Sequence, residues 1–230
     1  MVRRKKNKIL RWFLVAIVLV VLVFVAQKLY NKYLYEHSDA SLTAVERTWL
    51  NYKDDVKKAS EELNISPEYL LALIALECEG RKEVPSRFEP HIFVKLQDVR
   101  NGELKNFESI ATSDISNSSD DALKNLASSW GPFQLMGYQC LYLDIKLKEM
   151  RGKKAVYYGT LWIKNAYGKY LDKKKYKDAF HLHNTGKPYP KLGPPRTHNR
   201  HYVPRGIKFM KEFKVLFNNE AAQQNVGETN

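Results

Sequence analysis

The residue best suited to chemistry in this sequence is one carboxylate in an apolar segment. A helix is expected over residues 67–79, where Leu70, Leu73 and Ile74 share one face, since positions three or four apart lie together. Glu77 continues that face. A carboxyl group among apolar neighbours loses hydration, which favours its protonated form. Such a group can act as a general acid, for example in cleaving a glycosidic bond.

Local signals mark both ends of this helix. Ser66 is a good N-cap, Pro67 suits the first helical position, and Gly80 is a good C-terminal stop. Spacing alone leaves an ordinary alternative open. Glu77 could simply reach water from the last helical turn, or pair with Arg81 four residues on.

The remaining pattern predicts a mainly helical domain. Helices are expected over 41–63, 153–171 and 206–217, with another starting at 176–183. Residues 81–96 are expected to be irregular, 97–125 to form a long loop or small sheet lobe, and 184–206 to form a Pro- and Gly-rich loop. The tail 218–230 is expected to be disordered.

The N-terminal segment indicates a membrane anchor. Trp12 to Ala26 is an unbroken apolar run of 15 residues, which with its flanks approaches the roughly 20 needed to span a bilayer. We expect a basic cytoplasmic segment 1–11, a transmembrane anchor 12–30 and a juxtamembrane linker 31–40. A cleaved signal peptide is the alternative, although Phe24 stands where a small residue is expected.

Charge indicates both the orientation of the anchor and the kind of partner. Six basic residues precede the apolar run, so the N-terminus should stay in the cytoplasm and the domain should lie outside a bacterial inner membrane. Of the net charge of +13, the six N-terminal basic residues leave about +7 on the rest of the chain, which suits an anionic polymer such as a cell wall, but also nucleic acid or an anionic membrane. We find no RNA- or DNA-binding motif and expect no nucleic-acid partner. Cys78 and Cys140 could form a disulfide or remain two buried thiols.

Four segments resemble, in the same order, elements of the bacterial and phage N-acetylmuramidases and the related lytic transglycosylases. They are Ala72–Gly80 (ALIALECEG), Arg87–Phe93 (RFEPHIF), Ala127–Tyr138 (ASSWGPFQLMGY) and Ala179–Gly186 (AFHLHNTG). The first resembles the Ala-x-x-x-hydrophobic-Glu-Ser element, and the third resembles Ala-Ser-Trp-Gly-x-Phe-Gln-x-Met-Gly. The second resembles Phe-Glu-x-His-x-Phe, and the fourth resembles Ala-x-x-Tyr-Asn-small-Gly.

The resemblance implies a lysozyme-like α+β domain over 41–217, with two lobes around a cleft. It implies cleavage of the β-1,4 bond between N-acetylmuramic acid and N-acetylglucosamine in peptidoglycan, without a cofactor or metal. Glu77 matches the catalytic acid of the family. Residues implied to contact the glycan are Trp130, Gly131, Phe133, Gln134, Met136, Tyr138, His183 and Asn184. Trp130, Phe133, Tyr138 and also Tyr189 could stack on sugar rings.

The sequence departs from the family pattern at two positions. Cys78 replaces the usual Ser after the acid, and His183 replaces the usual Tyr before Asn184. These departures leave two reactions open, hydrolysis by water and the transglycosylase reaction, in which the 6-hydroxyl of muramic acid attacks.

Hydrolysis usually needs a second carboxylate. Glu89 is the preferred candidate, and its alternative role is an ion pair with Arg87 or His91. Further candidates are Glu79, Asp114, Asp120, Asp121 and Asp144.

Two functions of other classes are weighed against this one. His181, His183, His198 and His201 have spacings that could hold zinc in a wall peptidase, although no His-Glu-x-x-His motif accompanies them. A non-enzymatic wall-binding or secretion-apparatus protein on the same scaffold is the other. The sequence does not name a protein partner.

Overall fold

The computed structural model describes residues 14–15, 17–27 and 41–227, which fall in two units, Met1–Leu42 and Thr43–Asn230. In the first unit, residues 14–15 and 17–27 are helical. No helix within the described ranges is both long and apolar enough to cross a membrane. The expected anchor 12–30 lies partly outside the described residues, and the linker 31–40 and segment 1–11 lie wholly outside them.

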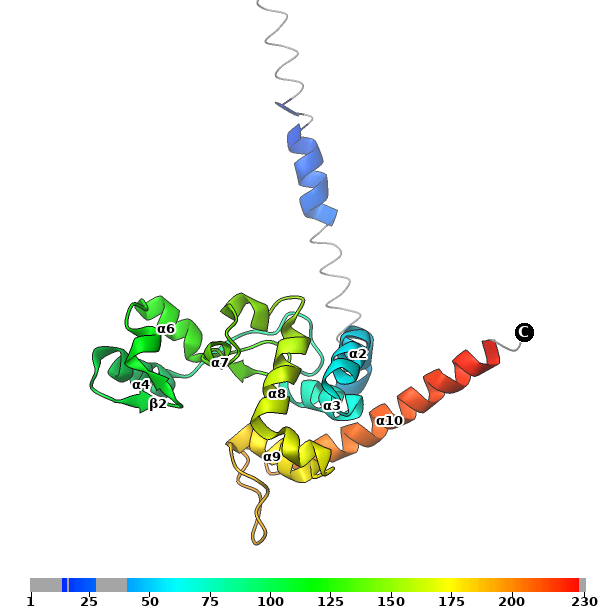
Figure 1. The fold of residues 1–230 in the computed structure, drawn as a ribbon. Coiled ribbons are helices and arrows are strands. Elements are labelled where there is room, and N and C mark those ends of the chain that lie inside the picture. Colours follow the sequence, from blue (N-terminus) through cyan, green and yellow to red (C-terminus); the bar gives the residue numbers. More distant parts are fainter. Residues whose placement is uncertain (1–13, 16, 28–40, 228–230) are drawn as a thin grey trace, which may run out of the picture. The chain divides into compact units, whose positions relative to one another are not determined.

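The second unit is mainly helical, as predicted (Figure 1). Its helices are α2 (Ala44–Leu63), α3 (Pro67–Cys78), α4 (Pro90–Asn101), α5 (Thr112–Ile115), α6 (Asp120–Leu126), α7 (Gln139–Tyr142), the 3-10 helix η1 (Leu147–Met150), α8 (Ala155–Asp172), α9 (Tyr176–Thr185) and α10 (Tyr202–Gly227). An antiparallel sheet has the order β1 (Arg87–Phe88), β4 (Ser128–Trp130), β5 (Leu135–Met136). A second sheet pairs β2 (Asn106–Phe107) with β3 (Ile110–Ala111).

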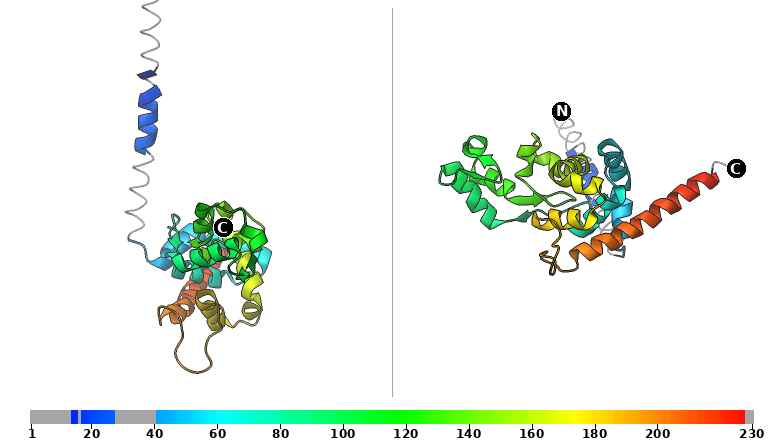
Figure 2. Two further views of the ribbon diagram at one scale, coloured as in Figure 1. Left: turned by 90° about the vertical axis from the view of Figure 1, so that its left-hand side faces the viewer. Right: turned by 60° about the horizontal axis from the view of Figure 1, so that its bottom comes forward.

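Helix α3 lies at the centre of this unit. Every side chain from Tyr69 to Ala75 is fully buried, and α2 and α10 both pack against the helix (Figure 2). The hydroxyl oxygen of Ser66 accepts a hydrogen bond from the backbone N–H of Tyr69 at 3.2 Å, and Pro67 occupies the first turn, as the sequence predicts. Because such a helix can hardly shift without exposing apolar surface, it gives Glu77 a fixed support.

Helix α2 holds the C-terminal end of α3. The last carbonyls of a helix lack partners inside it. Three side chains of α2 donate to carbonyl oxygens just after α3: Arg47 to Glu79 at 2.9 Å, Asn51 to Gly80 at 2.9 Å and Tyr52 to Arg81 at 2.6 Å. Glu79 and Gly80 both have left-handed backbone conformations, with φ of 55° and 73°. The helix therefore ends one residue before the predicted Glu79.

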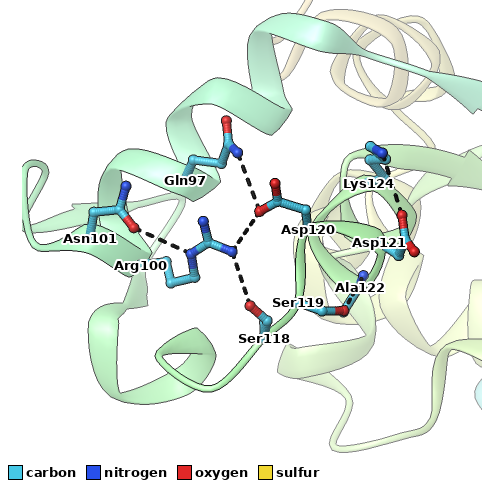
Figure 3. A network of polar contacts seen from close by, with 9 residues as sticks. All are labelled: Gln97, Arg100, Asn101, Ser118, Ser119, Asp120, Asp121, Ala122 and Lys124. Atoms are coloured by element: carbon cyan, nitrogen blue, oxygen red, sulfur yellow. Dashed lines mark hydrogen bonds and ion pairs between the residues drawn. The ribbon is translucent and has the colours of Figure 1, made fainter.

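Residues 90–126 form a second group of elements around α4, seen beside α6 and β2 in Figure 1. Figure 3 shows how α4 is tied to α6: Arg100 donates to the carboxylate of Asp120 at 2.7 Å and to the carbonyl of Ser118 at 3.1 Å. The prediction that 81–96 is irregular is wrong from Pro90 onward. Pro90 does not break structure there, because it begins α4, where a missing N–H costs nothing.

Helix α10 is longer than predicted at both ends. It begins at Tyr202 instead of 206, since Pro204 falls in the first turn, where proline is tolerated. The disordered tail expected from residue 218 is wrong as far as Gly227. Lys53 and Lys57 of α2 both contact the Glu220 carboxylate, and the Trp49 ring lies 4.8 Å from the Phe217 ring. These contacts hold α10 against α2, a long-range effect that the local composition does not reveal.

Gly80→Ala should lower the free energy of unfolding by about 2 kcal/mol or more, because φ is positive and the added Cβ would lie 2.4 Å from the backbone N of Thr48. Gly102→Ala is the matched control. Gly102 also has a positive φ, 80°, but nothing lies within 4 Å of its added Cβ, so we expect a loss of only about 1 kcal/mol. Urea unfolding of both variants measures the difference, and equal losses would show that α2 does not confine the end of α3.

Candidate active site

Glu77 lies at the C-terminal end of α3 with its side chain 16% exposed. The Tyr202 hydroxyl, from the first turn of α10, donates a hydrogen bond to Glu77 Oε1. Oε2 makes no hydrogen bond to any described residue, and no buried side-chain oxygen or nitrogen among those residues lacks a partner. Oε2 is therefore reached by solvent. One oxygen is held by the protein, and the other is open to a ligand.

A hollow of about 560 Å³ lies beside this carboxylate. Glu77 is not itself among the lining residues, but its chain neighbour Leu76 and its hydrogen-bond partner Tyr202 are. The lining is rich in cationic and amide side chains and comes from α3, β1, α9, α10 and the loop before α10: Leu76, Arg87, Asn184, Thr185, Arg196, His198, Asn199, Tyr202 and Arg205. Asn184, which the sequence predicts at the site, is among them. None of these lining residues is acidic.

His183 lies next to Glu77 and belongs to a chain of hydrogen bonds within the protein. Its Nε2 is 3.0 Å from the carbonyl oxygen of Phe133 and 3.8 Å from Glu77 Oε1. A carbonyl oxygen only accepts, so Nε2 carries the hydrogen and Nδ1 accepts from the Tyr167 hydroxyl at 2.8 Å. The Tyr167 oxygen is in turn 3.3 Å from the Tyr69 hydroxyl. His183 thus has both ring nitrogens engaged in contacts within the protein.

Burial sets the protonation of these groups. It lowers the pKa of His183 below its ordinary value of 6.5, against the smaller opposing effects of Glu77 and the Phe133 carbonyl. Burial likewise raises the pKa of Tyr167 and Tyr202 well above 10. Tyr202 therefore keeps its proton and remains a donor to Glu77, and His183 is a neutral positioning group.

Glu89, the preferred second carboxylate, is engaged in ion pairs. Its oxygens lie 3.0 Å from Arg87 Nε and 3.8 Å from His91 Nδ1, and its side chain is 25% exposed. This is the alternative role that the sequence left open. Glu89 does not line the hollow itself but contacts Arg87, which does.

Four of the other five carboxylate candidates also have local partners, and none of the five lines the hollow. Glu79 pairs with Arg81 at 2.5 Å, and Asp120 pairs with Arg100 at 2.7 Å. Asp121 lies 3.4 Å from Lys124, and Asp114 accepts from the backbone N–H of Ala111 at 2.8 Å. Asp144 lies outside the hollow, in a left-handed backbone conformation.

The Trp130–Tyr138 segment builds the turn between β4 and β5. Gly131 has φ of 72°, and a Cβ there would lie 2.1 Å from the Met150 carbonyl oxygen. The Gln134 side chain accepts from Ser129 Oγ at 2.8 Å and donates to the Gly131 carbonyl at 3.1 Å. Gly131 and Gln134, predicted as glycan contacts, shape this turn in the structure.

The predicted stacking aromatics differ in how accessible they are. Phe133 and Tyr138 are 1% and 7% exposed, so neither offers a ring face to a sugar, and Met136 is half-buried. Trp130 is half-buried with the Arg151 guanidinium 4.8 Å from its ring centre. Tyr189 packs edge-on against His181. Among the three aromatic residues of Trp130–Tyr138 predicted to stack on sugars, Trp130 is the most exposed to solvent.

His181 closes the loop between α9 and α10. It is 1% exposed, and its Nδ1 lies 2.7 Å from the carbonyl oxygen of Lys187, so Nδ1 carries the hydrogen. Its Nε2 accepts from the backbone N–H of Arg196 at 3.1 Å. Within the described part of the chain no group of three or more His, Cys, Asp or Glu side chains could hold a metal ion. Two of the histidines considered as zinc ligands, His181 and His183, have both ring nitrogens in contacts with other protein groups.

Both cysteines are free and buried. Burial raises the pKa of Cys78 to about 12 and that of Cys140 to about 11. Cys78 Sγ lies 3.4 Å from the Ile74 carbonyl oxygen, where it occupies the position of the usual serine as a small buried group. Of the two alternatives from the sequence, the structure has separate buried thiols.

Sequence reasoning missed Tyr202, Tyr167, Arg196 and Arg205. Only their position in the fold brings them to the site, since Tyr202 is 125 residues away from Glu77. The Pro-rich loop before α10 was a weak signal of a structured segment. Comparisons with protein-family models, curated proteins and solved structures find no match.

The lowered pKa of His183 predicts how stability depends on pH. The unfolded chain takes up a proton on this residue as pH falls through about 6.5, whereas the folded protein resists it to lower pH. His183 therefore contributes a loss of unfolding free energy as pH falls below 6.5, at most about 1.4 kcal/mol per pH unit.

His183→Gln should flatten this slope between pH 7.5 and 5, measured by urea unfolding. His201→Gln, at an exposed position, is the control and should keep the slope. Identical slopes in all three proteins would contradict a buried neutral His183.

Proposed function

We propose that the chain is a peptidoglycan-cleaving glycosidase acting on the β-1,4 bond between N-acetylmuramic acid and N-acetylglucosamine, with Glu77 as general acid. One observation carries this proposal. Glu77 is a largely buried carboxylate with Oε1 held by Tyr202 and Oε2 open to solvent beside a basic hollow. The four family-like segments agree with it, since the first contains Glu77 and the fourth contains Asn184 of the lining.

The chemistry follows from the two oxygens. Protonated Oε2 gives its proton to the glycosidic oxygen, the C1–O bond breaks with its electrons going to that oxygen, and the sugar carries an oxocarbenium-like charge. A nucleophile then attacks C1 and returns a proton to Glu77. Tyr202 and His183 act as positioning residues, because both lie against Oε1 and leave Oε2 to the substrate.

Two nucleophiles remain candidates. Water would give a hydrolase with reducing ends, and the muramic acid 6-hydroxyl would give a lytic transglycosylase with 1,6-anhydro ends. A specific observation favours the second route: no carboxylate lines the hollow, and Glu89 is paired to Arg87 and His91. A reaction whose nucleophile is carried by the substrate does not require a second carboxylate, whereas hydrolysis usually does.

The wider setting is part of the same proposal. We propose a lysozyme-like two-lobed domain in which the elements around α4 face the helices around α3 across the glycan. We further propose that the N-terminal segment anchors it in the inner membrane, with the domain outside. The apolar run after a basic start supports the anchor. A wall-binding or secretion protein without activity is the competing proposal.

Glu77→Gln should lower the rate at which soluble fragments are released from purified peptidoglycan by about a hundredfold or more, because an amide cannot donate the proton. Glu79→Gln is the matched control two residues on. Its carboxylate is exposed and paired with Arg81, so activity should remain. Mass spectrometry of the fragments identifies reducing or anhydro ends.

Intact folding of each variant is checked by circular dichroism and by unchanged urea unfolding. Fragment release by a folded Glu77→Gln protein would remove Glu77 as the acid. Wall binding without any release from the folded parent chain would favour the non-enzymatic scaffold.

A further inference from the structure

We infer that the hollow beside Glu77 binds the carboxylates of the peptide stem attached to muramic acid, through Arg196 and Arg205. The inference rests on the proposed function and names the part of the substrate that this side of the site recognises. It implies that the protein acts on strands that still carry peptides, in preference to strands trimmed by an amidase.

The charge of the lining is the first reason. Three arginines and His198 face the hollow, and no lining residue is acidic. Arg87 is compensated by Glu89, but Arg196 and Arg205 form no ion pair with any described residue. Two uncompensated guanidinium groups beside one hollow favour an anionic ligand, and the planar fork of Arg matches a carboxylate in a bidentate manner.

The loop that carries Arg196 is held in place, which is the second reason. The buried ring of His181 bonds the carbonyl of Lys187 and the N–H of Arg196, so it joins the two sides of the loop between α9 and α10 (Figure 1). Thr197 Oγ1 adds a bond to the Asn199 carbonyl at 2.7 Å. An arginine fixed by its backbone loses less freedom on binding than one on an unsupported loop.

Arg205 is placed by α10. Its guanidinium lies 5.5 Å from the ring centre of Phe209, one turn further along the helix. The same helix carries Tyr202, three residues earlier, which holds Glu77 Oε1. Binding at Arg205 and proton transfer at Glu77 are therefore organised by the same first turns of α10.

The size and polarity of the hollow select the peptide among anionic groups. About 560 Å³ exceeds what one carboxylate needs, and the side-chain amides of Asn184 and Asn199 in the lining suit backbone amides. Thr185 Oγ1 is engaged with His181 and Lys187. A stem peptide matches the arginines and the amides together, since it has free carboxylates separated by amide groups. A trimmed strand keeps only the lactyl carboxylate of each muramic acid.

The test uses the full chain in detergent micelles, with Glu77→Gln introduced so that ligands survive. Calorimetry compares a tetrasaccharide of alternating N-acetylglucosamine and N-acetylmuramic acid that bears its stem peptides with the same tetrasaccharide after amidase treatment. We expect the peptide-bearing ligand to bind about tenfold more tightly. Adding Arg196→Gln and Arg205→Gln should reduce this preference to about onefold.

Arg200→Gln is the matched control, since Arg200 is exposed in the same loop but does not line the hollow. It should leave the preference intact. Arg196→Lys should restore part of the preference lost by Arg196→Gln, because the charge remains but the fork does not. Equal binding of both ligands, or an equal loss with Arg200→Gln, overturns the inference.

A cleavage assay with the unmodified chain distinguishes failure of the inferred peptide preference from failure of the proposed function. Glu77-dependent cleavage of both ligands at equal rates leaves the proposed function standing and overturns the peptide preference. Cleavage of neither ligand, with peptide-dependent binding through the arginines, overturns the proposed function and leaves the binding site.

Discussion

The structure depends on the burial of α3 and on the way its C-terminal end is held. Seven consecutive side chains from Tyr69 to Ala75 are removed from water, so the helix is fixed laterally by the hydrophobic effect. The carbonyl oxygens of the three residues just after α3 accept hydrogen bonds from Arg47, Asn51 and Tyr52 of α2. Glu77, the last but one residue of α3, is thereby held in place without being sealed from solvent.

The two carboxyl oxygens of Glu77 have different surroundings. Tyr202 donates to Oε1, and the neutral ring of His183 stands beside it, oriented by Phe133 and Tyr167. Burial keeps Tyr202 protonated and His183 uncharged, so neither competes for the proton that the proposed reaction needs. His183 is thus an ordered part of the site.

Charge is distributed in agreement with an anionic wall polymer as the proposed ligand. Several acids outside the hollow are paired locally, as with Asp120 and Arg100 in Figure 3, whereas Arg196 and Arg205 line the hollow. A single open carboxyl oxygen next to cationic side chains suits a substrate that brings its own negative charge. Because no lining residue of the hollow is acidic, the hollow itself offers no second catalytic carboxylate.

The sequence by itself determined α3 to within one residue at its end, its N-cap at Ser66 and the position of Glu77 on it, because these follow from local periodicity and end signals. The sequence-based prediction was wrong at Pro90, which begins α4 instead of continuing an irregular stretch. It was also wrong at the end of α10, which contacts with α2 extend beyond residue 217. Only the tertiary structure decided which groups meet Glu77. Tyr202, His183 and Arg196 come from distant segments, and their approach depends on packing, which short-range patterns do not encode.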